Sequence, residues 1–153
     1  PVANDLRLIV AILKINNDLE RIADLSVNIA ERAVYLSNKA RVELPFDLQN
    51  MADKVRTMLR QSLDALVNRD SNLARQVCEA DDAVDDLNRE MYSCVEQAIK
   101  HDPDNLNSYI QLLSASRYLE RIADHSTNIA EDVIYLVTGE IIRHGTKTDD
   151  TAF

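Results

Sequence analysis

The sequence predicts an all-α protein built from long antiparallel helices. Only two Gly and three Pro occur among its 153 residues, too few to punctuate a fold of many short strands. Hydrophobic residues make up 46% of the chain and return at spacings of three and four, which is the period of an amphipathic helix. One eighteen-residue segment with this helical pattern also occurs twice in the chain. We therefore expect an antiparallel three-helix bundle preceded by one long helix.

The first two helices are expected at about 4–38 and 47–67. Each shows a regular apolar stripe, and a polar stretch before Pro45 separates the two. The first stripe consists of Leu8, Ile12, Ile15, Leu19, Ile22, Ala23, Ile29 and Ala33, and the second of Met51, Val55, Met58, Leu59, Leu63 and Leu66.

The third and fourth helices are expected at about 73–100 and 104–142. Asp70 or Ser71 suits the N-cap of the third helix, and Asp102 suits the cap of the fourth because Pro103 follows it at the first helical position. Gly139 is expected to loosen the last turn of the fourth helix. Because the connections are short, successive helices should pack antiparallel.

The duplicated segment carries a line of oxygen-bearing side chains in both copies. Residues 19–36 and 119–136 agree at thirteen of eighteen positions, and each copy has Glu, Asp and Asn four residues apart. Such a spacing places the three side chains on one side of a helix, and neither carboxylate has a Lys or Arg four residues away along it. A duplicated line of uncompensated oxygen donors indicates cation binding, through Glu20, Asp24, Asn28, Glu120, Asp124 and Asn128.

The third helix supplies a second group of acids in residues 81–86. Asp81 and Asp85 are one helical turn apart, as are Asp82 and Asp86. Folded against the fourth helix, either pair could face Glu120 and Asp124 there, making a shell for a hard or borderline divalent cation. The alternative is that the acids form a solvated surface. Repetition of the same polar line favours the metal site over that alternative.

Charge and missing motifs exclude several function classes. The net charge of −9 argues against nucleic acid and against docking on anionic lipid. The longest apolar run, residues 8–13, is too short to span a bilayer, so no membrane insertion is expected. Cys78 and Cys94 are about 24 Å apart along one helix and are expected to be reduced thiols of a cytosolic protein. No phosphate-binding Gly-rich loop and no Glu-x-x-His pair occur, so we expect no enzyme.

Two segments carry a resemblance to a known family. DLRLIVAILKINNDLERIADLSVNIAE (5–31) and YLERIADHSTNIAEDVIYLVTGEIIRH (118–144) resemble the PhoU family of regulators of bacterial phosphate uptake, and the resemblance covers nearly all of residues 1–142. It implies two tandem three-helix bundles whose E(D)xxxD motifs hold a multinuclear transition-metal cluster, of iron or zinc. The positions that match the motifs are Glu20 with Asp24, Glu120 with Asp124, and Asp81 with Asp85, while Asn28 and Asn128 are weaker candidates.

The resemblance also implies a role and partners. It implies a cytoplasmic, non-catalytic adaptor that represses phosphate-starvation signalling when phosphate is plentiful. Its partners would be the phosphate ABC transporter and a sensor histidine kinase. The competing interpretation is a metal-free helical scaffold or oligomerisation module whose acidic lines are only solvated.

The resemblance divides the chain into three parts. Residues 1–42 correspond to the last helix of a first repeat, N-terminally truncated, whose two partner helices are missing. Residues 46–143 correspond to a complete second three-helix bundle, and residues 144–153 to a flexible tail. The first helix then has a broad apolar face without a partner from its own repeat. We therefore expect a homodimer or a higher oligomer.

Overall fold

The computed structural model describes residues 2–44 and 46–142, and it is all-α in these ranges. The four helices are α1 (Val2–Ser37), α2 (Leu48–Asn68), α3 (Ser71–His101) and α4 (Leu106–Thr138), with a 3-10 turn, η1 (Pro103–Asn105), between the last two. The expected fold class is confirmed. The tail expected at 144–153 lies outside the described residues.

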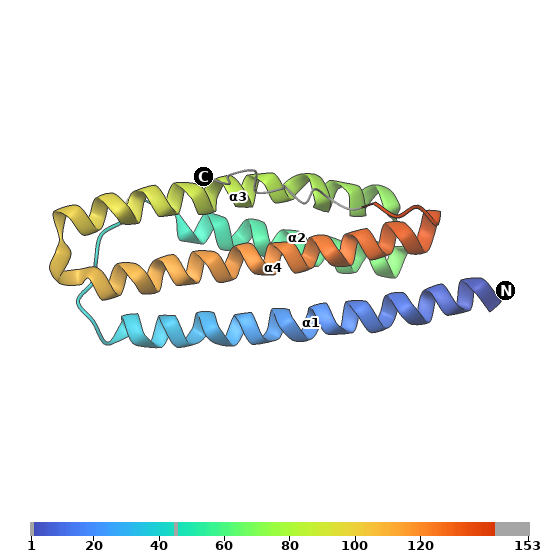
Figure 1. The fold of residues 1–153 in the computed structure, drawn as a ribbon, viewed down its shortest axis with the longest axis horizontal. Helices are drawn as coiled ribbons and strands as arrows, with labels where there is room; N and C mark the ends of the chain where they lie inside the picture. Colours follow the sequence, from blue (N-terminus) through green and yellow to red (C-terminus); the bar gives the residue numbers. More distant parts are fainter. Residues whose placement is uncertain (1, 45, 143–153) are drawn as a thin grey trace, which may run out of the picture.

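One helix, α4, contacts all the others. Helices α2, α3 and α4 pack on one another as a bundle, whereas α1 lies along α4 and packs against no other helix of the described chain (Figure 1). No helix in the described ranges is long and apolar enough to cross a membrane. The division of the chain into a partial first repeat and a complete second repeat stays a prediction.

Local capping explains where α2 and α3 begin. The Asp47 carboxylate accepts a hydrogen bond from the Asn50 N–H at 2.9 Å, which caps α2. The Asp70 carboxylate accepts hydrogen bonds from the N–H groups of Asn72 and Leu73 at 3.0 Å each, so the sequence-based N-cap of α3 is confirmed. Between the two helices Arg69 takes a left-handed conformation with φ of 51°, which reverses the chain within two residues.

The expected bounds of the fourth helix were wrong at both ends. Helix α4 stops at Thr138 because Gly139 adopts a left-handed conformation (φ 75°) and its N–H bonds the Tyr135 carbonyl at 2.9 Å. It starts at Leu106, after the 3-10 turn. Asp102 is both the C-cap of α3 and the N-cap residue of η1, which begins with Pro103, but its side chain makes no capping hydrogen bond there.

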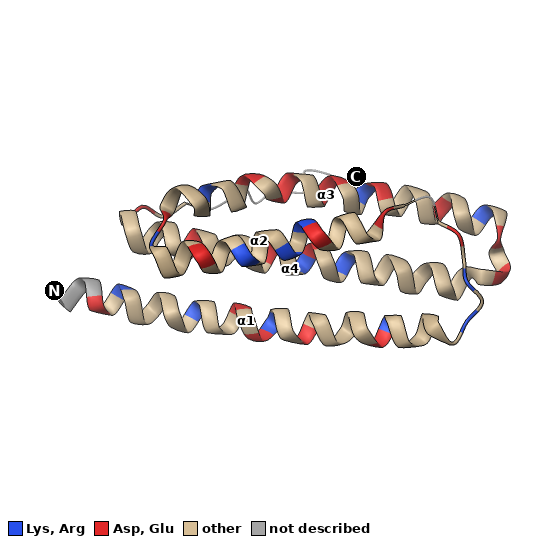
Figure 2. Ribbon diagram, turned by 180° about the vertical axis from the view of Figure 1, so that it is seen from behind, with Lys and Arg blue, Asp and Glu red and all other residues tan. Residues whose placement is uncertain are grey.

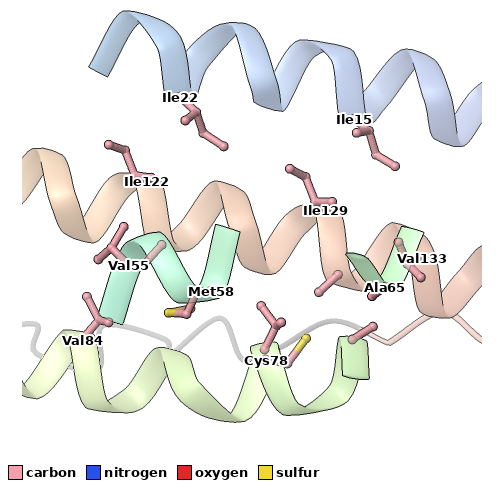
Figure 3. Close-up of a cluster of buried hydrophobic side chains, with 14 of the residues drawn as sticks. Ile15, Ile22, Val55, Met58, Ala65, Cys78, Val84, Ile122, Ile129 and Val133 are labelled. Carbon is pink, nitrogen blue, oxygen red and sulfur yellow. The ribbon is translucent and has the colours of Figure 1, made fainter. Parts of the chain in front are cut away.

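The main core lies around α4. Ile122 and Ile129 of α4 lie between Ile15 and Ile22 of α1 on one side and the α2–α3 side of the bundle on the other (Figure 3). Val55, Met58, Cys78 and Val84 complete that second side. The apolar stripe of α2 is confirmed, with Met51, Val55 and Met58 buried and Leu59, Leu63 and Leu66 half-buried.

The expected stripe of α1 divides into two faces. Ile15 and Ile22 are buried against α4, whereas Ile12 is 50% exposed and Leu19 is 37% exposed. A helix with a single neighbour buries only a narrow arc, so the wider stripe expected from the sequence remains partly at the surface.

Polar contacts flank the apolar contact between α1 and α4. Lys14 pairs with the buried Asp132 at 2.7 Å between Nζ and Oδ1. Asp18 accepts a 3.3 Å hydrogen bond from the Asn128 amide and lies 2.7 Å from His125 Nδ1. Because these contacts require specific partners on both helices, they fix the register of α1 on α4.

A test of this core compares two isoleucines on α4. Ile129 is fully buried and Ile110 is 43% exposed. Ile129→Ala should lower the free energy of unfolding by about 2–5 kcal/mol, because it leaves a cavity among three packed elements. Ile110→Ala should cost less than about 1 kcal/mol. Urea denaturation of both variants checks this, and equal losses would contradict the burial described.

Candidate metal centre

The packing of α3 on α4 brings acidic side chains from both helices together. One carboxylate oxygen from each of Asp81, Asp85 and Asp124 lies within 4.8 Å of the others. Asp81 and Asp85 share one side of α3 because they are one helical turn apart. The structure thus selects this pair over Asp82 and Asp86, which are both exposed. Acidic residues recur along α3 (Figure 2).

Glu120 borders this group and is held by a short polar chain. The Asn88 amide donates a long hydrogen bond of 3.4 Å to Glu120 Oε2, and the Ser116 hydroxyl donates one of 2.8 Å to Asn88 Oδ1. Ser116 is fully buried, so its side chain anchors this series of hydrogen bonds in the core. This arrangement orients the Glu120 carboxylate, as the outer groups around metal ligands commonly do.

Like charge and burial raise the pKa values of the α4 carboxyls. Desolvation, followed by the charges of Glu120 and Asp85, raises the pKa of Asp124 to about 6. Desolvation and then Asp85 also raise the pKa of Glu120, while Arg117 and Arg121 oppose this shift. The cluster therefore tends to hold protons, and a bound cation would relieve the same repulsion.

The contact between α3 and α4, which we call the α3–α4 seam, extends past the carboxylates to Cys78. Burial, with smaller contributions from the charges of Glu131 and Asp81, raises the pKa of the Cys78 thiol to about 11. In the metal-free chain the thiol therefore remains protonated at neutral pH. Neither Cys78 nor Cys94 forms a disulfide, as expected.

The first copy of the motif has different surroundings. Glu20 and Asp24 are exposed on α1, and Asp24 pairs with Arg21 at 3.5 Å. Asn28 is half-buried. Within the described ranges these residues join no group of three potential metal ligands, because α1 packs only on α4. Their role as ligands stays a prediction.

Asn128 also lies apart from the cluster. Its amide nitrogen donates to Asp18 of α1, so this side chain is engaged at the α1–α4 contact. His125, next to Asp124, contacts Asp18 as well, so it too lies at the α1–α4 contact.

Sequence reasoning did not assign Asn88 and Ser116 to the centre. Helical spacing could have found both, since Asn88 follows Asp85 by three residues and Ser116 precedes Glu120 by four. Taken together, the half-buried side chains of Asp81, Asp85 and Glu120, with Asp124, form an all-oxygen donor set that suits a hard or borderline divalent cation.

Comparison with known proteins identifies the family. A family model described as the PhoU domain matches residues 1–33 and 48–133. The chain belongs to the PhoU family. The second matched range contains all four carboxylates of the centre, and the first contains Glu20, Asp24 and Asn28.

Relatives in the PhoU family are similar over most of this chain. It is 39% identical over 139 residues to a phosphate-specific transport system accessory protein PhoU homolog of Clostridium acetobutylicum, covering 91% of this chain and 64% of that protein. It is 35% identical to PhoU homolog 1 of Thermotoga maritima, covering 92% of this chain and 61% of that protein. The chain spans less than two thirds of the length of these curated relatives.

Solved structures agree with this assignment. The crystal structure of PhoU from Pseudomonas aeruginosa matches with a TM-score of 0.86 and 37% identity, over 92% of this chain and 68% of that one. The phosphate transport system regulatory protein PhoU of Streptococcus pneumoniae matches with a TM-score of 0.67 and 26% identity, over 92% of this chain and 66% of that one.

The raised pKa of Asp124 predicts a pH-dependent stability of the metal-free chain. The folded state holds a proton on Asp124 up to about pH 6, whereas the ordinary value is 3.8. The folded chain therefore binds more protons than the unfolded chain between these values, and its stability falls as the pH rises through them. Asp124→Asn removes this fall, so the stability gained by the variant over wild type should grow from about pH 4 to pH 6 and then level off.

Urea denaturation in the presence of chelator, repeated across this pH range, measures the effect. Asp24→Asn is the matched control, because Asp24 is the counterpart of Asp124 in the exposed first copy. Its difference from wild type should show no such pH dependence. A flat difference for Asp124→Asn, or an equal trend in both variants, would mean that the α3–α4 seam does not perturb Asp124.

Proposed function

We propose that this PhoU-family chain is a metal-binding regulatory component of phosphate-specific transport. The ions are held between α3 and α4 by Asp81, Asp85, Glu120 and Asp124. The observation that carries this proposal is the convergence of three carboxylate oxygens from two helices within 4.8 Å of one another. Curated relatives named as accessory proteins of phosphate-specific transport support the regulatory part.

The proposed ions act as a structural link. They supply positive charge where like-charged carboxylates meet, and so join α3 to α4 across the seam. In line with the family resemblance, we propose a multinuclear cluster of iron or zinc. The names of the relatives describe accessory or regulatory proteins, which supports an adaptor more than a catalyst.

The proposed adaptor acts in the cytoplasm through protein contacts. It represses phosphate-starvation signalling when phosphate is plentiful, by binding the phosphate ABC transporter and a sensor histidine kinase. Support for the transporter comes from the names of the relatives. Support for the kinase comes from the family resemblance of the duplicated motif.

Removing two ligands should remove the metal. Glu120→Ala with Asp124→Ala should reduce the metal content of protein purified without chelator to a small fraction of the wild-type ratio, because both α4 carboxylates are lost. Elemental analysis by plasma mass spectrometry measures the ratio, with Fe, Zn and Mn determined together. Circular dichroism checks that the variant keeps its helices.

The repeat provides a matched control for this experiment. Glu20→Ala with Asp24→Ala removes the same residue types from the exposed copy on α1. This variant should keep the metal of the second copy. Wild-type metal content in the Glu120/Asp124 variant would reject the proposed ligands, and metal-free wild type after reconstitution with all three ions would favour the scaffold interpretation.

A second candidate function is self-association through α1, and the exposed apolar side chains of this helix favour it. Ile9, Ile12, Leu13, Leu19, Val27 and Val34 are between 37% and 65% exposed. Burying such a side chain fully is worth about 1.5–3 kcal/mol, so a face of this kind favours association. We propose that α1 pairs with α1 of a second copy, which would place Glu20 and Asp24 near their counterparts.

Sedimentation velocity at low micromolar concentration tests this pairing. Wild type should sediment as a dimer or a larger species, and Ile12→Glu with Leu19→Glu should shift it to the 17.3 kDa monomer. A control with Val67→Glu and Leu106→Glu changes exposed apolar residues on α2 and α4 and should leave the assembly intact. A wild-type monomer that retains its full helix content would rule the pairing out.

A further inference from the structure

A pocket of about 340 Å³ lies where α3 ends, apart from the carboxylate centre. We call it the end pocket. The connection between α1 and α2, helix α3 and the first turn of α4 all contribute to it. The side chains that matter to its chemistry are Glu43, Glu90, Cys94, Ala98, Asp102 and Tyr109.

The inner part of the end pocket is apolar. Tyr109 is buried in a small core cluster with Met91 and Val95, and Ala98 packs against that cluster. The Tyr109 hydroxyl donates a 3.2 Å hydrogen bond to the Asp102 carboxylate, and the Asn105 amide donates a second of 2.8 Å. Asp102 is therefore fixed in place at the edge of an apolar surface.

The outer part of the end pocket is acidic. Glu43, Glu90 and Asp102 line it, and in the described ranges no lysine or arginine forms an ion pair with any of these three. Lys100, the nearest lysine along α3, is engaged with Glu96 at 2.7 Å. Among the described residues that line the pocket, His101 is the single basic one.

The end of α3 adds to this negative potential. Helix α3 has 31 residues and terminates at His101, with Asp102 as its C-cap, so its negative dipole end is at the pocket. An apolar inner surface with an acidic rim fits a side chain that is apolar along its stem and positive at its tip.

We propose that the end pocket binds an arginine side chain presented by a partner protein. The methylene stem lies on Ala98 and Tyr109, and the planar guanidinium donates hydrogen bonds to the carboxylates at the rim. Arginine fits better than lysine because its five donors in a fixed fork can bridge more than one carboxylate. A pocket with a charged anchor of this kind is typical of the centre of a protein interface.

The end pocket and the metal centre are separate. Tyr109 and Glu120 are eleven residues apart on α4, which is about 16 Å along the helix. The lining of the end pocket shares no residue with the carboxylate group of Asp81, Asp85 and Asp124. The inference does not depend on metal binding.

Cys94 provides a native probe of the end pocket. It lines the pocket and is partly exposed, whereas Cys78 is buried, so rapid alkylation by neutral iodoacetamide reports on Cys94. The probe ligand is the peptide acetyl-Gly-Arg-Gly-amide. Its control replaces Arg by citrulline, which has nearly the same shape and no charge. The Arg peptide should slow the alkylation of Cys94 saturably, followed by mass spectrometry of the full chain, and the citrulline peptide should not.

Variants locate the interaction. Glu43→Gln and Glu90→Gln should each raise the peptide concentration that half-protects Cys94 by about two- to fivefold, the range found for exposed ion pairs. Glu79→Gln changes an exposed acid elsewhere on α3 and should have no effect. Absence of protection, equal protection by the citrulline peptide, or equal weakening by Glu79→Gln would overturn the proposal. Protection by spermidine at lower concentration than the peptide would also overturn it, in favour of a free polyamine.

Discussion

Electrostatic repulsion across the contact between α3 and α4 is the constraint on which the proposed function depends. Burial, and after it the charges of neighbouring carboxylates, raise the pKa of Glu120 and raise that of Asp124 to about 6. The helices nevertheless stay together because Val84 of α3 and Ile134 of α4 are fully buried in the core that the two helices share. Hydrophobic packing thus holds the carboxylates so close together that protons or a cation must offset their repulsion.

The two copies of the duplicated motif show that this constraint comes from packing and not from the motif alone. Glu120 and Asp124 meet the acids of α3. Glu20 and Asp24 have the same spacing on α1 but meet no acids from a second helix in the described ranges, and Arg21 neutralises part of their charge. An acidic pair on a helix becomes a candidate metal centre only when a second helix brings further carboxylates to it.

Much of this could be predicted from the sequence, because helices and caps depend on local interactions. The regular spacing of apolar residues predicted the four helices, and Asp70 caps α3 as expected. The choice between Asp81 with Asp85 and Asp82 with Asp86 could not be made, because it depends on the rotation of α3 about its axis once packed. Asn128 turned out to contact α1, since a residue at the edge of the polar line can face either neighbour of α4.

Other differences come from contacts that are distant in sequence or specific to one backbone position. Asp102 has the right residue type for an N-cap, but its carboxylate accepts from Asn105 and Tyr109 instead. The end of α4 depends on the left-handed conformation of Gly139, which a periodic apolar pattern running on to residue 142 concealed. The end pocket combines residues from three elements and has no sequence signal of its own.

The most direct test of the account is an anomalous difference map from crystals of the chain grown with iron or zinc. Anomalous peaks are expected between α3 and α4, with Asp81, Asp85 and Asp124 among the coordinating side chains. Peaks confined to Glu20 and Asp24 on α1, or a fully ordered α3–α4 seam without any peak at saturating metal, would contradict it.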